Sequence, residues 1–238
     1  MSERIIQALL RLFAVFAKTD GNKSDKIKIV ELFLSNQLNK ELAKKYLPSF
    51  EQEYDDVMND ISRITEKADL QDTIDAEKVK FKIEAKLSAR IHKIGNSMNQ
   101  ELTQRQKLYV IISLLEFVST DSSISESDKE FMDALVDDLN INEEEYQQLC
   151  EFILHPFLEI PDSENLMIIN NRQETGEVIA KHINSPHLDG TIKVFYLQAS
   201  NLLIFRSFEV GEISLNSQPA YEDNVTILNI GSAIRSLQ

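Results

Sequence analysis

Apolar residues recur every three or four positions through the first two thirds of the chain, which is the spacing of amphipathic helices. The pattern predicts helices over 3–18, 24–38, from 42 onward, 77–98, 108–118, 125–138 and 142–155. The stretch 108–118 reads LYVIISLLEFV and is apolar nearly all round, as expected for a central helix. The polar stretch 59–78 is weakly patterned, and we expect a mobile connection or a frayed helix there.

Two of these helices have an apolar face whose members can be named in advance. In the helix from 42 onward the face contains Leu42, Tyr46, Phe50 and Tyr54. In 77–98 it contains Phe81, Ile83, Leu87, Ile91, Ile94 and Met98. All of these side chains are predicted to lie in the core of a helical bundle.

The pattern changes near residue 156. Residues 1–155 contain two Gly and one Pro, whereas the remaining 83 residues contain four of each. β-Branched and aromatic residues there predict strands at 166–170, 177–182, 191–198, 201–208, 212–216 and 225–230. The predicted fold class is therefore α+β in two domains. An all-α domain over 1–155 precedes a small all-β domain over 160–238, a sandwich or roll.

The net charge of −14 changes which partners can be expected. Nucleic acid and anionic membrane surfaces would repel this chain, whereas cationic proteins or divalent metals would not. Cys150 is the single cysteine, which excludes an internal disulfide, fits a reducing compartment and is predicted to be an inert core residue. The apolar segment 5–17 is short, contains Arg11 and precedes charged residues, so we expect a buried helix of a cytoplasmic protein without membrane insertion.

A short motif occurs twice. Residues 16–25 read FAKTDGNKSD and residues 117–126 read FVSTDSSISE; aligning 9–39 with 110–140 gives eight identities. The identities cluster at a loop and on the apolar face that follows it. We interpret the motif as a duplicated helix–loop–helix whose two copies pack about a pseudo-twofold axis.

The residue types of the repeated loop suggest how its second helix begins. Ser24 and Ser125 are placed to cap that helix, and the acids that follow meet the positive end of its dipole. Two such corners side by side would gather five carboxylates: Asp20, Asp25, Asp121, Glu126 and Asp128. Two interpretations stay open, a capping and turn signature or an oxygen-ligand site for a hard divalent cation. An EF-hand is excluded because Asp25 replaces the required Gly and Met132 falls at the final ligand position.

Motifs of catalysis are missing from the sequence. There is no Glu-x-x-His pair, no His-Glu-x-x-His, no Gly-x-Ser-x-Gly and no phosphate-binding Gly-x-x-x-x-Gly-Lys-Ser/Thr. We expect His155 to cap a helix end, and His182 and His187 to be exposed loop residues. Arg206 and Arg235 are expected to be paired or on edge strands. The chain is therefore predicted not to be an enzyme.

The pieces TDGNKSD and TDSSISESD, each after an apolar helix, resemble the loops of the tellurite-resistance TerB-like family. The resemblance implies an all-helical domain of about seven helices with an internal duplication. It also implies a site for a divalent cation (Ca²⁺, Mg²⁺ or Zn²⁺) at Asp20, Asp25, Asp121, Glu126 and Asp128. This sequence departs from the family's pattern at Ile27, where an acid is usual, and at Ser122, where Gly is usual. We therefore expect weak binding.

A TerB-like domain followed by a β module that ends in LNIGSAIRS resembles the N-terminal region of large bacterial ATP-binding cassette transporter proteins. In that setting the β module is similar to forkhead-associated sandwiches. The resemblance implies a non-catalytic cytoplasmic accessory region whose partners are further domains of the same transporter polypeptide. The alternative is a stand-alone TerB-like metal-binding adaptor of a stress response.

Overall fold

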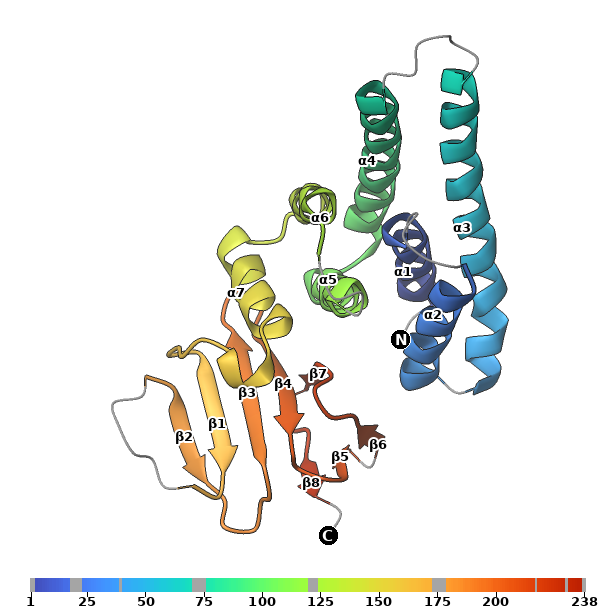
Figure 1. Cartoon of the computed structure of the whole chain (residues 1–238). Helices are drawn as coiled ribbons and strands as arrows, with labels where there is room; N and C mark the ends of the chain where they lie inside the picture. Colours follow the sequence, from blue (N-terminus) through green and yellow to red (C-terminus); the bar gives the residue numbers. More distant parts are fainter. Residues whose placement is uncertain are drawn as a thin grey trace. The chain divides into compact units, whose positions relative to one another are not determined.

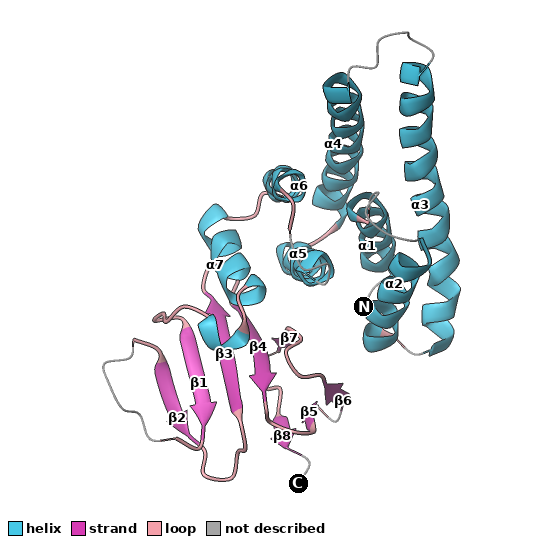
Figure 2. Ribbon diagram, in the orientation of Figure 1, coloured by secondary structure: helices cyan, strands magenta, loops and turns pink. Residues whose placement is uncertain are grey.

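The computed structural model describes residues 3–17, 23–38, 40–69, 76–119, 124–172, 179–216, 218–229 and 231–236. The chain divides into two compact units, Met1–Ile141 and Asn142–Gln238. Within the described residues, seven α-helices precede a sheet-rich region (Figures 1 and 2), which confirms the predicted α+β class. Helix α7 (Glu143–Leu154) groups with the strands, so the division falls at 141/142 and not after 155, where the sequence analysis placed it.

The first unit is helical. Its helices are α1 (Glu3–Phe16), α2 (Lys23–Gln37), α3 (Lys40–Asp69), α4 (Ala76–Glu101), α5 (Gln104–Ser119) and α6 (Glu126–Asp138). Helix α1 contacts α3, α4 and α5 and is buried along most of its length, with Leu12 and Phe13 fully inaccessible. Helix α5 is also largely buried, as its apolar sequence predicted. These two helices form the centre of the unit because their apolar residues occupy more than one face.

Helices α3 and α4 form a long antiparallel hairpin. Of the two alternatives for 59–78, a mobile connection is wrong where the structure describes it: residues 59–69 belong to α3 and 76–78 to α4, while 70–75 lie outside the described residues. The weak apolar pattern of 59–69 agrees with its burial, since Ile61 is the only buried side chain among those described in 59–68. Ion pairs instead join the two helices, with Arg90 to Glu53 at 3.0 Å and Arg90 to Asp60 at 3.5 Å.

Two residues assigned to apolar faces point outward. Phe81 is 72% exposed and Leu42 is 39% exposed, although both have core spacing. In α3 the inward position next to Leu42 is taken by Ala43, which is 3% exposed. Spacing shows that a helix has an apolar face, but it does not show how far along the helix that face is covered.

The second unit contains eight short strands in the described residues: β1 (Leu166–Asn170), β2 (Lys181–Asn184), β3 (Thr191–Leu197), β4 (Leu202–Phe208), β5 (Ile213–Leu215), β6 (Gln218–Ala220), β7 (Thr226–Leu228) and β8 (Ile234–Ser236). They form a five-stranded sheet in the order β2-β1-β3-β4-β7 and a three-stranded sheet in the order β6-β5-β8. Among the described strands, only the β1–β2 pair is parallel. Strands β6 and β8 were not predicted.

The five-stranded sheet is covered on both faces. Ile192 and Val194 of β3 and Phe205 of β4 form one core with Val210 and Ile213. Because successive side chains alternate, the neighbouring positions of the same strands point to the α7 side, where Phe195 contacts Phe152 with ring centroids 5.4 Å apart. The second unit is thus a helix, a sheet and a smaller sheet, rather than strands alone.

Candidate functional site

Two of the five predicted metal-binding acids, Asp20 and Asp121, lie outside the described residues. Asp25 is in the first turn of α2 with its side chain 62% exposed, and Lys28 binds it at 3.1 Å. Glu126 begins α6, is 82% exposed at its side chain and is 3.4 Å from Lys129. Both carboxylates therefore have a lysine one helical turn away on their own helix.

Asp128 belongs to a capping box at the start of α6. Its backbone N–H donates to Ser125 Oγ at 3.1 Å, while the Ser125 N–H donates to Asp128 Oδ2 at 3.3 Å. The Ser125 hydroxyl also donates to Asp128 Oδ2 at 2.5 Å. This reciprocal arrangement satisfies donors at the helix terminus. The predicted cap at Ser125 is confirmed, and Asp128 functions as its partner.

The predicted cap at Ser24 is wrong. Helix α2 begins at Lys23, so Ser24 lies inside the first turn. The residue three positions after Ser24 is Ile27, which has no acceptor to return a bond to the cap.

The helices that lead into the two repeated loops are in contact at their C-terminal ends. The rings of Phe13 in α1 and Phe117 in α5 stack with centroids 4.3 Å apart, and Phe16 meets Phe131 edge-on at 6.3 Å. The following helices have different neighbours, since α2 packs on α3 and α6 packs on α4. Among the residues that the structure describes, no three His, Cys, Asp or Glu side chains are grouped to hold a metal ion.

A second polar cluster was not predicted, and it lies under the C-terminal end of α7. Arg206 of β4 is 4% exposed, and its Nη1 donates to the carbonyls of Phe152 and His155 at 2.7 and 2.9 Å. Its Nε also donates to Asp223 Oδ1 at 3.1 Å, so the pairing expected for Arg206 is confirmed. A cation at this position complements the negative end of the helix dipole and satisfies the last carbonyls.

Lys193 lies opposite Arg206 in the β3–β4 register and is also buried. Its Nζ donates to the carbonyl of Phe157 at 2.8 Å. Burial, and then the charge of Arg206, hold the pKa of Lys193 below its usual value, with Asp162 acting in the opposite direction. The sequence contains one signal for these residues: a single cation stands inside each of two apolar runs, Lys193 in TIKVFYL and Arg206 in LLIFRSF.

The N-terminal end of α7 is attached to the same hairpin. Glu145 is 4% exposed, and its two carboxylate oxygens accept the Ser200 N–H at 3.0 Å and the Ser200 hydroxyl at 2.5 Å. Ser200 lies in the turn between β3 and β4. Glu145 and Arg206 therefore fix α7 to the sheet at its two ends, and Lys193 holds the segment that follows α7 through the Phe157 carbonyl, which is a structural role for all three.

Two of the three histidines for which a place was predicted, His155 and His187, are found there, and His182 is not. His155 Nδ1 lies 2.9 Å from the Glu151 carbonyl, which confirms its expected place at a helix end. His187 is exposed between strands, as expected. His182 is instead half-buried in β2 and lies 2.9 Å from Asn170 Oδ1. Cys150 is half-buried on α7 and is not a core residue.

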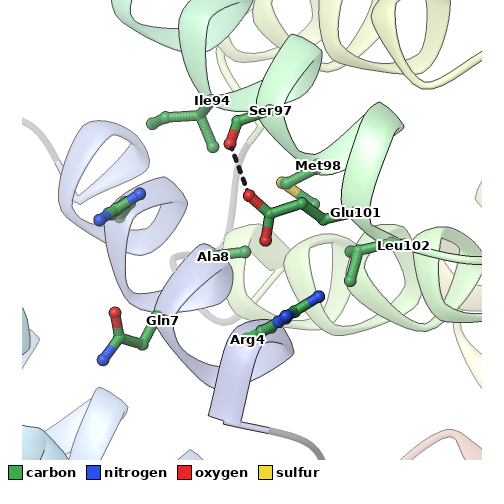
Figure 3. Close-up of a pocket in the computed structure, with 9 residues that line it drawn as sticks. Arg4, Gln7, Ala8, Ile94, Ser97, Met98, Glu101 and Leu102 are labelled. Atoms are coloured by element: carbon green, nitrogen blue, oxygen red, sulfur yellow. Dashed lines mark hydrogen bonds between the residues drawn. The ribbon is translucent and has the colours of Figure 1, made fainter.

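A pocket of about 190 Å³ lies between α1 and α4 (Figure 3). Its floor is apolar, with Ala8, Ile94, Met98 and Leu102. Its polar lining consists of Arg4, Gln7, Arg11, Ser97 and Glu101. Ser97 donates to Glu101 at 3.3 Å, and Arg11 pairs outside the pocket with Glu53 at 3.3 Å. Charges of both signs line this small pocket, so the lining favours neither an anion nor a cation.

None of the described helices combines the length and apolar character that are needed to cross a bilayer. No protein-family model, curated protein or solved structure matches the chain.

Proposed function

We propose that this chain is a non-catalytic module that acts by binding other proteins. The observation that carries the proposal is the far part of the α3–α4 hairpin, which is helical but is not covered by a third element among the described residues. None of the described residues in 62–68 and 76–86 is buried. In Figure 1 this part of the hairpin extends past α1 and α2.

Helices with so little burial are poorly stabilised on their own, because most helical stability in proteins comes from packing one apolar face. The far part of the hairpin nevertheless contains apolar residues, among them Ile64 and Ile83, which are half-buried, and Phe81, which is exposed. Binding of a protein at this surface would remove apolar area from water, at about 25 cal/mol per Å².

The setting that we propose is an accessory region of a bacterial ATP-binding cassette transporter protein. Support comes from the resemblance of the repeated loops to the TerB-like family and from the order of a helical region followed by a sheet-rich one. The β module would be the forkhead-associated-like part, and the partners would be other domains of the same polypeptide. In this proposal a weak divalent-cation site at the repeated loops assists assembly.

Amide hydrogen exchange on the purified chain tests the premise of the binding role, namely that the far end of the hairpin is not stabilised by packing within the chain. We expect amides of 62–68 and 76–86 to exchange at least about a hundredfold faster than those of α1, because the hairpin end lacks packing. Equal protection in the two regions would contradict the proposal.

The reading frame after Gln238 tests the proposed transporter setting: a phosphate-binding motif and apolar spans of about 20 residues are expected. A stop codon directly after Gln238 would count against a transporter.

A metal-binding adaptor is the second candidate function. The stacking of Phe13 on Phe117 favours it, because it brings together α1 and α5, the two helices that precede the acidic motifs in the sequence. Calorimetry with Ca²⁺, Mg²⁺ and Zn²⁺ on the wild type and on the double variant Asp20→Asn/Asp121→Asn tests it. Equal heats for the two proteins would exclude these loops as ligands.

A further inference from the structure

The pocket between α1 and α4 (Figure 3) has walls of opposite charge above an apolar floor. The floor is buried and consists of Ala8, Ile94, Met98 and Leu102. Arg4 belongs to the α1 wall and Glu101 to the α4 wall. In Figure 3, Glu101 extends from α4 toward α1 above Ala8, and Arg4 extends from the first turn of α1 below it. A ligand in this space would therefore meet apolar area and charges of both signs.

The two charges are not neutralised within the part of the chain that the structure describes. Arg4 makes no hydrogen bond or ion pair to a described residue. Glu101 accepts one hydrogen bond through Oε1, from the Ser97 hydroxyl at 3.3 Å. The second cation of the lining, Arg11, is paired through Nε with Glu53 at 3.3 Å. The guanidinium of Arg4 and a carboxylate oxygen of Glu101 are thus left to face the same space.

The stability of their own helices does not explain these two charges. Arg4 lies in the first turn of α1, where the partial positive charge of the helix end disfavours a cation. Glu101 is the last residue of α4, where the partial negative charge of the helix end disfavours an anion. Each helix end has the same sign as its side chain. Both helix ends therefore strengthen the charge that a ligand in the pocket would meet.

Size and charge together indicate the class of ligand. The pocket has a volume of about 190 Å³, which is below the range of about 300–1,000 Å³ for drug-sized ligands. A simple anion would lie beside the Glu101 carboxylate and a simple cation beside the Arg4 guanidinium, and like charges in contact are unfavourable. A small molecule with both a carboxylate and an ammonium group meets an opposite charge on each wall. An apolar side chain on that molecule would cover the buried floor.

We propose that this pocket binds a free α-amino acid with an aliphatic side chain. Its carboxylate binds the guanidinium of Arg4, which can donate two parallel hydrogen bonds to it. Its ammonium group binds the carboxylate of Glu101, and its side chain contacts Met98 and Leu102. The site uses none of the residues in 62–68 or 76–86. It therefore goes beyond the proposed protein-binding role and does not depend on it.

Titration of the full chain with L-leucine, followed by NMR, tests the inference. We expect saturable binding with a dissociation constant of about 1 mM, because so small a ligand makes few contacts. Two further probes each lack one charged group: isocaproate has no ammonium group, and isoamylamine has no carboxylate. Each should bind at least about tenfold more weakly than leucine, since it loses a charge-assisted hydrogen bond and leaves a like charge beside it.

Variants assign each charged group of the ligand to its partner. Arg4→Met should weaken leucine binding at least about tenfold without weakening isoamylamine binding. Glu101→Gln should weaken leucine binding to a similar extent without weakening isocaproate binding. Arg63→Met and Glu66→Gln are the matched controls, because both residues are exposed on α3, and they should bind leucine as the wild type does. Arg4 and Glu101 are also exposed, so their variants should keep the wild-type circular dichroism spectrum.

Several results would overturn the inference. They are no saturable binding of leucine by the wild type, binding of either single-charge probe as tightly as leucine, and equal leucine affinity of Arg4→Met and the wild type. A loss of leucine binding in the two control variants would place the site elsewhere and would overturn the inference as well. None of these results bears on the proposed function, which hydrogen exchange at the far part of the hairpin tests separately.

Discussion

Helix α7 and the far part of the α3–α4 hairpin are both helices with many charged residues, but they are held in different ways. Buried charged groups fix α7 at both ends, through Glu145 to Ser200 and through Arg206 to the last carbonyls. The hairpin is joined by ion pairs near the surface and has no buried residue in 62–68 or 76–86. The difference separates a helix that is fixed by buried bonds to distant parts of the chain from one that is held only by its neighbour in the hairpin.

The largest effect is expected at Arg206. Replacement by Met leaves carbonyls of α7 without their donor beneath the helix, so the second unit should lose about 3 kcal/mol of unfolding free energy. Urea unfolding followed by circular dichroism measures it. The control is Arg235→Met, because Arg235 is exposed on the edge strand β8 and should change stability by less than about 0.5 kcal/mol. Equal losses would mean that Arg206 does not anchor α7.

A smaller loss is expected at the other end of α7. Glu145→Gln keeps the size of the side chain but removes the charge that accepts two bonds from Ser200, and should cost about 1–2 kcal/mol. Glu144→Gln serves as the control, since Glu144 is exposed in the same turn. If the two variants unfold at the same urea concentration, the contact to Ser200 contributes nothing.

A substitution in the α3–α4 hairpin should cost less unfolding free energy, and the cost should depend on the salt concentration. Asp60→Asn removes the acceptor of both Arg90 and Lys86, whose nitrogens lie 3.5 Å from it. Because these groups are near the surface, we expect a loss of about 0.5–1 kcal/mol at low salt, which shrinks by 0.5 M salt as the charges are screened. A loss that does not change with salt would contradict an ion-pair origin.

The smallest effect concerns pH. The pKa of Lys193 is lowered in the folded chain from its usual 10.5, so above the folded pKa the unfolded chain binds more protons at this residue. Its contribution to stability should therefore rise as the pH increases toward 10.5. Unfolding free energies of wild type and Lys193→Met between pH 7 and 10 measure this. The difference in favour of the wild type should grow with pH, and a constant difference would contradict the shift.

The local spacing of apolar residues was sufficient to predict most helices and strands. The helix predicted over 125–138 is observed as Glu126–Asp138, and the strand predicted over 166–170 is observed over the same residues. The long-range contacts were not predictable in this way. Phe81 has core spacing but no neighbour to cover it, and α7 groups with strands because its partners, Ser200 and Arg206, come about 50 residues later.

For the candidate site, the sequence indicated one of two local roles correctly. Ser125 caps α6 because Asp128 stands three positions after it, whereas Ser24 is followed by Ile27 and does not cap α2. The cluster of Arg206, Lys193 and Glu145 could not be assembled from the sequence. Lys193 and Arg206 are each a single cation in an apolar run, but only the strand register shows that they are neighbours, and Glu145 is one of three consecutive acids.

The attachment of α7 also has a consequence for biosynthesis. Its anchoring bonds join residues 51 to 55 positions apart, so α7 leaves the ribosome well before the β-hairpin that receives it. The preceding six helices find their neighbours among residues already made. Translation should therefore yield a folded first unit while α7 still awaits its sheet, and a ribosome paused near residue 190 would hold that helix undocked.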